Sequence, residues 1–199
     1  MAEPWQPSTT SMSTIDPPNP STLLILGDGR GALGINLRLA RKTTSRELLI
    51  GQGIVAPLTG FVGEKGRLGD VIHTFRPSVY IVSPRFVSAL RAIDATGWTA
   101  TPIELEDLAG ADGYALFGVT GRCGRTIGAS DIPTPGLHPY GRYLDMSTWD
   151  GSDVFLPESC DCIFLTPRCA SALKRANLVN IRLDPTGLEA LPSGGVSEG

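Results

Sequence analysis

The sequence predicts an α+β fold in which two related strand–helix–strand units share one core, preceded by an additional N-terminal α/β segment. Three observations predict it. The chain has 199 residues, of which 41% are hydrophobic, enough to bury a core in one domain of ordinary size. Its 24 glycines and 16 prolines indicate many turns and argue against long helices. The third observation is an internal repeat.

The repeat emerges when the chain is displaced by 83 residues against itself, because residues 69–93 then align with 152–176 without a gap. The matched segments are Asp70-Val71 with Asp153-Val154, Ser83-Pro84-Arg85 with Thr166-Pro167-Arg168, and Ser88-Ala89-Leu90 with Ser171-Ala172-Leu173. Self-similarity at a fixed spacing indicates a repeated structural unit. We expect the copies to extend over 69–105 and 152–183.

Both ends of the chain are expected to be tails. Residues 1–20 contain five prolines among Ser and Thr, and residues 192–199 consist mainly of small and polar residues. Such segments cannot bury enough apolar surface to offset the entropy of ordering them. The folded part is therefore expected to be one domain over residues 21–191.

Each copy reads as a buried strand followed by a helix. The apolar runs at 79–82 and 162–165 predict the strands. Ser83 and Thr166 are typical N-cap residues, and the prolines that follow suit the first helical position. A short strand is expected after each helix, at 103–105 and at 181–183, so that the second copy reaches it five residues sooner.

The remaining elements are predicted from shorter apolar runs. Leu23–Leu26 and residues 114–119 each read as a strand. Between them we expect a helix around 35–42 and strands at 47–50 and 54–56. Residues 121–152 form a stretch rich in loops.

A glycine-rich segment follows the first apolar run. Gly29, Gly31 and Gly34 match the G-x-G-x-x-G spacing of a dinucleotide-binding loop, and Glu47 stands about where a ribose-binding carboxylate would lie. However, Asp28 would place a carboxylate beside the phosphates, and a chain with 24 glycines produces such matches by chance. A nucleotide-binding enzyme that uses the Gly29–Gly34 loop is therefore kept as an alternative, and no cofactor is predicted.

The cysteines are expected to be buried, reduced thiols. Cys123, Cys160, Cys162 and Cys169 contain no C-x-x-C pair, and a Cys-x-Cys on a strand points its thiols to opposite faces. His73 and His138 belong to no catalytic motif. We therefore predict no metal site and no catalytic residues.

Two charged residues recur in the repeat. Asp70 and Asp153 occupy equivalent positions, which we interpret as turn or cap residues. Arg85 and Arg168 stand at the second helical position, where the helix dipole does not favour a cation. We hypothesise that each arginine reaches the aspartate of its own copy.

An acidic stretch near the second copy is the candidate partner-binding surface. Asp145, Asp150, Asp153, Glu158 and Asp161 fall within residues 145–161, which contain no Lys or Arg. One interpretation is a solvated loop face. The other is an acidic surface for a basic partner, anchored by Trp149.

The net charge of −3 and a calculated pI of about 5.4 argue against nucleic-acid binding through a basic face. No segment approaches the run of about 18 apolar residues that spans a membrane. The first twenty residues contain no Lys or Arg, so no secretory signal is predicted. A cytoplasmic location is expected.

Over residues 64–191 the sequence resembles a bacterial family of small α+β proteins grouped with the immunity proteins of polymorphic toxin systems. The resemblance is carried by Asp70-Val71, Val82-Ser83-Pro84-Arg85-Phe86 and their counterparts in the second copy. It implies a non-enzymatic protein, without cofactor, that binds and neutralises a cognate toxin by occluding its active site. A regulatory protein-binding module with another partner is the second alternative.

Overall fold

The computed structural model describes residues 16–52, 54, 57–127 and 143–190. The tail expected at 192–199 and most of the tail expected at 1–20 lie outside these residues. Within the described part the N-terminal tail ends before Pro20, which is buried at the start of a short 3-10 helix, η1 (Pro20–Thr22). The Thr186 hydroxyl donates a hydrogen bond of 2.8 Å to the Pro20 carbonyl.

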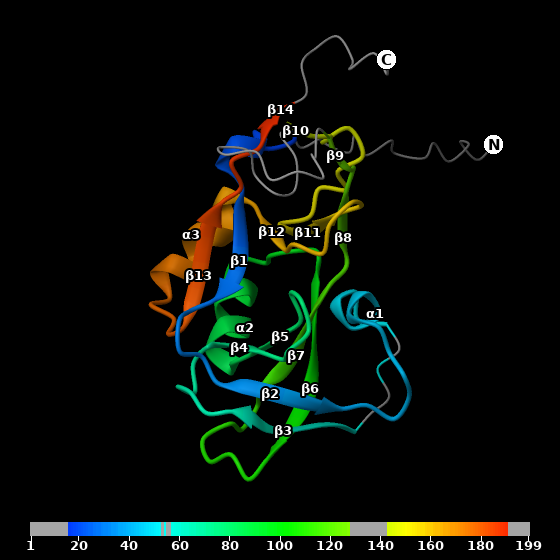
Figure 1. The fold of residues 1–199 in the computed structure, drawn as a ribbon. Helices are drawn as coiled ribbons and strands as arrows, with labels where there is room; N and C mark the ends of the chain where they lie inside the picture. Colours follow the sequence, from blue (N-terminus) through cyan, green and yellow to red (C-terminus); the bar gives the residue numbers. More distant parts are fainter. Residues whose placement is uncertain (1–15, 53, 55–56, 128–142, 191–199) are drawn as a thin grey trace, which may run out of the picture.

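The architecture is α+β, with many short strands and few helices (Figure 1). The helices are α1 (Ser45–Leu49), α2 (Pro84–Arg91) and α3 (Pro167–Arg175). The strands are β1 (Leu24–Asp28), β2 (Gly34–Arg38), β3 (Leu58–Glu64), β4 (Val71–His73), β5 (Tyr80–Val82), β6 (Trp98–Glu106), β7 (Ala115–Val119), β8 (Gly121–Cys123), β9 (Thr126–Ile127), β10 (Tyr143–Leu144), β11 (Val154–Pro157), β12 (Phe164–Leu165), β13 (Ile181–Pro185) and β14 (Glu189–Ala190).

The strands form three sheets. Six of them close a barrel in the order β2-β3-β6-β7-β5-β4. A five-stranded sheet has the order β13-β1-β12-β11-β8, and a three-stranded sheet has the order β14-β10-β9. Closing the barrel removes free strand edges from this part of the molecule.

Two strand pairs share one register. In β4 and β5, Val71 lies opposite Val82, and in β11 and β12, Val154 lies opposite Leu165. Each position in the second pair follows its counterpart by 83 residues. The same spacing continues into the next strands, because Pro102 of β6 and Pro185 of β13 are both paired. The prediction that the second strand comes five residues sooner is therefore wrong, since β6 already begins at Trp98.

The strands β1 and β7 connect parts of the chain that are far apart in sequence. β1 pairs with β12 and β13 near the C-terminus, whereas β7 pairs with the earlier strands β5 and β6. The N-terminal strand thus completes the sheet of the C-terminal segment. Residues near the middle of the chain complete the barrel.

The N-terminal segment departs most from the prediction. The helix expected around 35–42 is the strand β2, in which Ile35 is buried and Arg38 is exposed. The strand expected at 47–50 is the helix α1, which begins with a reciprocal capping box between Thr44 and Glu47. The strand expected at 54–56 falls partly outside the described residues.

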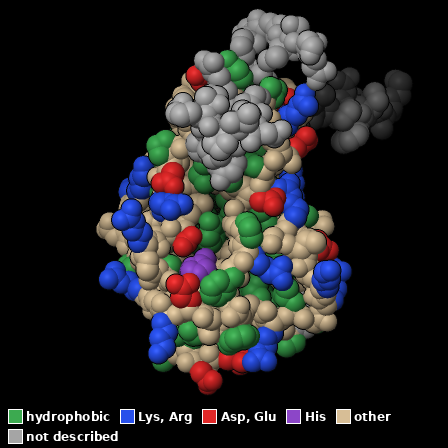
Figure 2. Space-filling view, in the orientation of Figure 1, with side chains coloured by type: hydrophobic (Ala, Val, Ile, Leu, Met, Phe, Trp, Pro, Cys, Tyr) green, Lys and Arg blue, Asp and Glu red, His purple; other side chains and the backbone are tan. Residues whose placement is uncertain are grey.

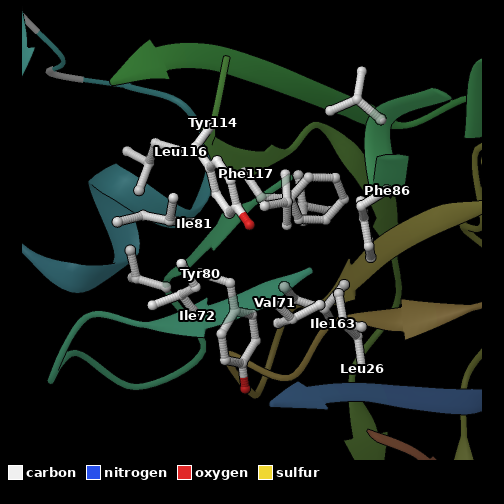
Figure 3. Close-up of a cluster of buried hydrophobic side chains, with 14 of the residues drawn as sticks. Leu26, Val71, Ile72, Tyr80, Ile81, Phe86, Tyr114, Leu116, Phe117 and Ile163 are labelled. Carbon is white, nitrogen blue, oxygen red and sulfur yellow. The ribbon is translucent and has the colours of Figure 1, made fainter. Parts of the chain in front are cut away.

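The helices α2 and α3 confirm the predicted N-caps. The hydroxyls of Ser83 and Thr166 accept hydrogen bonds from the backbone N–H groups of Phe86 and Cys169. The larger hydrophobic cluster contains side chains from both the barrel and the five-stranded sheet. Phe117 of β7 lies edge-on to Phe86 of α2, with ring centroids 5.2 Å apart, and Ile163 lies below them (Figure 3).

The strand pairing predicts the behaviour of a chain cut in the loop between β6 and β7, at residues 107–113. The N-terminal fragment would hold β1 without β12 and β13, and the C-terminal fragment would hold β7 without β5 and β6. We expect neither fragment to show native near-UV circular dichroism or cooperative unfolding alone, and their mixture to recover both. A chain nicked in this loop after folding should stay one particle; a native spectrum from either fragment alone would contradict the expectation.

Candidate partner-binding surface

Each helix N-cap belongs to a small polar cluster. The Ser83 hydroxyl donates a hydrogen bond to Asp70, and Nη1 of Arg85 lies 3.2 Å from Asp70 Oδ2. In the second cluster the Thr166 hydroxyl donates to Asp153 at 2.9 Å, and Arg168 donates to both carboxylate oxygens at 3.1 and 2.6 Å. The contact expected of Arg85 and Arg168 is therefore present in both clusters.

The two arginines also reach across to the opposite helix. Nη2 of Arg85 donates to the carbonyls of Ala176 and Asn177, both at 3.0 Å, where α3 ends. Nη1 of Arg168 donates to the carbonyl of Ile93 at 2.6 Å, just beyond α2. Carbonyls at a helix C-terminus lack partners within the helix and favour a nearby cation. Each arginine therefore joins the start of one helix to the end of the other.

Asp153 does not belong to a partner-binding surface. Its side chain is 10% exposed, and its carboxylate also accepts the backbone N–H of Thr96 at 3.1 Å. Burial alone would raise the pKa of Asp153, but hydrogen bonds from Arg168, Thr166 and the Thr96 amide outweigh burial and lower it. The carboxylate is thus committed to the fold, which corrects its assignment as a partner-binding residue.

The other acids of the stretch differ in what they offer to a partner. Asp150 and Glu158 are exposed, whereas Asp145 and Asp161 are half-buried. Their printed partners lie within the chain: Asp145 accepts the Ser147 amide at 2.9 Å, Asp150 accepts the Arg122 amide at 2.8 Å and the Ser152 amide at 3.0 Å, and Asp161 pairs with Arg46 at 2.6 Å. The acidic stretch is therefore partly neutralised by Arg46 of α1, which the local sequence could not reveal.

Trp149 forms a wall of a cavity of about 650 Å³. Its indole N–H donates to the Ser152 carbonyl at 3.0 Å, and its ring lies edge-on to Phe155 at 6.3 Å. Pro18 and Pro167 add further apolar surface, and Asp16 lies at the same cavity. Its volume is typical of sites that take a small molecule or a partner's side chain.

The corresponding position beside the first cluster has a smaller cavity, of about 300 Å³. It is lined by Asp70, Ser83, Pro84 and Arg85, the counterparts of four residues at the Trp149 cavity. Tyr114 stands in its wall and donates a hydrogen bond to the Gly69 carbonyl at 2.9 Å. The cavity beside Trp149 is thus the larger of two similar hollows.

The Gly29–Gly34 loop lacks the geometry of a dinucleotide site. After Gly34 the chain enters the strand β2 rather than a helix, so no helix N-terminus is presented to a phosphate. Glu47 lies in α1 and accepts the amide and hydroxyl of Thr44. The alternative of a nucleotide-binding enzyme has therefore lost the structural context it required.

The cysteines lie mostly in the interior. Cys123, Cys162 and Cys169 are buried and Cys160 is half-buried, all as free thiols. Burial raises the pKa of Cys123 and of Cys169 to about 12. Among the described residues no group of three or more His, Cys, Asp and Glu side chains could hold a metal ion.

One exposed cluster was missed from the sequence. His73 lies edge-on to Phe75, with ring centroids 5.1 Å apart. Its two ring nitrogens are each 3.6 Å from a carboxylate oxygen, one of Asp28 and one of Glu64. In Figure 2 the purple side chain is His73, because His138 lies outside the described residues, and acidic side chains flank it. The one available signal was an aromatic residue, Phe75, in the turn between two predicted strands.

Comparisons with known proteins assign no relative. The chain matches no protein-family model, and a search of curated proteins finds no match. The resemblance to immunity proteins therefore stays a prediction. None of the helices in the described part of the chain is long and apolar enough to cross a membrane.

The polar clusters predict a stability effect for Arg168→Ala. The change leaves the buried Asp153 carboxylate without its cation and uncaps the Ile93 carbonyl. We expect a loss of about 2 kcal/mol in the free energy of unfolding, since Arg168 is half-exposed and the loss stays below that of a fully buried pair. Urea denaturation measures it. The control is Arg91→Ala, an exposed arginine of α2; equal losses in both variants would contradict the assigned role.

The lowered pKa of Asp153 predicts how stability depends on pH. The contribution of this carboxylate is complete above the unfolded-state pKa, about 3.9, and is lost as pH falls through the lower folded-state pKa. We expect the free energy of unfolding to fall more steeply below about pH 4 in the wild type than in Asp153→Asn. Parallel acid dependence in the two proteins, measured by urea denaturation at each pH, would show that Asp153 does not contribute.

Proposed function

We propose that the chain is a non-enzymatic immunity protein that binds and neutralises a cognate bacterial toxin in the cytoplasm by occluding the toxin's active site. The cavity beside Trp149 is the observation that carries the proposal. A rigid, half-buried indole beside an apolar hollow suits an interface hot spot, which packs a partner's side chain out of water. The resemblance of residues 64–191 to immunity proteins supports the same function.

The exposed acids near the cavity give the surface its charge. Asp150 is the residue after Trp149, and Asp16 lies at the cavity itself. Asp150 uses its carboxylate on two backbone amides, which fixes the position of the negative charge. Fixed charges at the rim of an interface accelerate association with a partner of opposite charge. The toxin surface is accordingly expected to be basic around an apolar side chain.

We further infer that the fold contains two copies of one unit, joined in tandem. The equal registers of β4–β5 and β11–β12 support it, as do the matching polar clusters. A third correspondence lies in the parallel pairs, in which Phe61 faces Glu106 in β3–β6 and Tyr143 faces Glu189 in β10–β14. The first copy would then run from β1 to β6 and the second from β7 to β14, with their first strands exchanged. Residues 21–63 would form the opening strands of the first copy.

The functional proposal is tested by co-purification followed by neutralisation. The tagged wild type is recovered from its native lysate, and each co-purifying protein is expressed alone and together with the wild type. We expect one partner to be toxic alone and harmless in co-expression. A regulatory module would instead recover a partner that is not toxic.

Two variants locate the interface. We expect Trp149→Ala and Asp150→Lys to lose protection and to weaken toxin binding at least tenfold, the effect typical of a lost anchor or reversed rim charge. The matched control is Asp112→Lys, which places the same charge change beside the smaller cavity. Near-UV circular dichroism confirms that each variant is folded. Full protection by both Trp149→Ala and Asp150→Lys would exclude this surface.

A further inference from the structure

The outer surface of the β2–β3 pair carries an aromatic face, defined by Asn36, Phe61, Gly63, His73 and Phe75. Phe61 and Phe75 are 38% and 51% exposed, and the two strands lie at the lower end of the molecule in Figure 1. Exposed aromatic side chains that gather on one surface are typical of protein interfaces.

Two glycines bring Phe75 onto this sheet. A Cβ atom on Gly34 would lie 2.7 Å from Cζ of Phe75, and one on Gly63 would lie 2.6 Å from Cε2. Real Cβ atoms do not approach other heavy atoms so closely. The ring therefore lies directly against the backbone of β2 and β3, and it can do so because both residues lack a side chain. The result is a low aromatic surface rather than a protruding loop.

Phe75 adopts this position at a cost to the free chain. Its φ of +56° lies in the left-handed region, which is unfavourable for a bulky side chain. Its ring is also left half in water. Strained, exposed aromatic residues persist where another state of the protein uses them, so the cost points to burial of Phe75 against a partner.

The charges at the two ends of the aromatic face have opposite sign. At one end the Arg38 guanidinium lies 5.0 Å from the Phe61 ring centroid and pairs with Glu106. At the other end the carboxylates of Asp28 and Glu64 flank His73 and have no Lys or Arg partner among the described residues. A surface with a basic end and an acidic end is complementary to itself when it is turned end for end.

We propose that the aromatic face is the interface of a symmetric dimer formed with a second copy of this chain. A two-fold axis in the plane of the face and perpendicular to the strands places Arg38 of each copy opposite Glu64 of the other. The same rotation brings Phe61 of each copy over Phe75 of the other, and Asn36 lies near the axis. An interface of this kind uses the same patch on both subunits and closes at two copies.

The dimer is a separate proposal from toxin binding, because the aromatic face shares no residue with the Trp149 cavity. The test is sedimentation velocity over a wide range of protein concentration, with the full chain and no added partner. We expect the weight-average sedimentation coefficient of the wild type to rise from the monomer to the dimer value.

Three variants examine the geometry. Phe75→Gly relieves the positive φ, so it should fold at least as well as the wild type while it weakens dimerisation by roughly thirtyfold, as expected for a hot-spot aromatic residue. Arg38→Glu and Glu64→Arg should each weaken the dimer, and the double variant should restore it. The matched control is Val179→Glu, which changes an apolar residue of 38% exposure outside the face and should dimerise like the wild type.

Several outcomes overturn the proposal. A wild type that remains monomeric at every concentration excludes the dimer. Dimerisation that survives in Phe75→Gly, or that is lost equally in Val179→Glu, places the interface elsewhere. Failure of the double charge swap to recover any affinity lost by the single variants excludes the end-for-end arrangement. None of these results depends on whether a toxin exists.

Discussion

The rest of the structure depends on the reciprocal contact between α2 and α3. Arg85 at the start of α2 binds the carbonyls that end α3, and Arg168 at the start of α3 binds the carbonyl that follows α2. Each arginine is held by a buried aspartate that also accepts the N-cap hydroxyl of the same helix. A single network therefore fixes the position of both helices relative to the barrel and the five-stranded sheet.

This network explains why part of the fold was predictable from sequence. The Ser-Pro and Thr-Pro caps, the apolar strands before them and the ion pairs between Arg85 and Asp70 and between Arg168 and Asp153 are local consequences of the repeat. All of them lie within fifteen residues of each other in each copy. The long-range half of the network, from each arginine to the opposite helix, leaves no mark on the local pattern.

The N-terminal segment was predicted less well for physical reasons. Residues 34–38 are a strand because β3 and β4 supply partners for their backbone, and tertiary pairing overrides local preference in such short segments. The capping box at Thr44 and Glu47 was a readable signal for α1 that the apolar run at 47–50 obscured. Of the candidate site, Trp149 and the exposed acids could be found from composition. The burial of Asp153 and the cradle of Phe75 could not, because both depend on residues far away in the chain.

The exchange of β1 and β7 has a consequence for the synthesis of the protein. Leu24 pairs with Leu165, 141 residues later, so the first strand to leave the ribosome is among the last to find its neighbours. At about 5–20 residues per second, the apolar segment around Leu23–Leu26 stays unpaired for roughly 7–30 seconds in the growing chain. During that interval it is an exposed, aggregation-prone strand of the kind that chaperones bind. Translation that stops early leaves this strand permanently without its partners, so only nearly complete chains can reach the folded state.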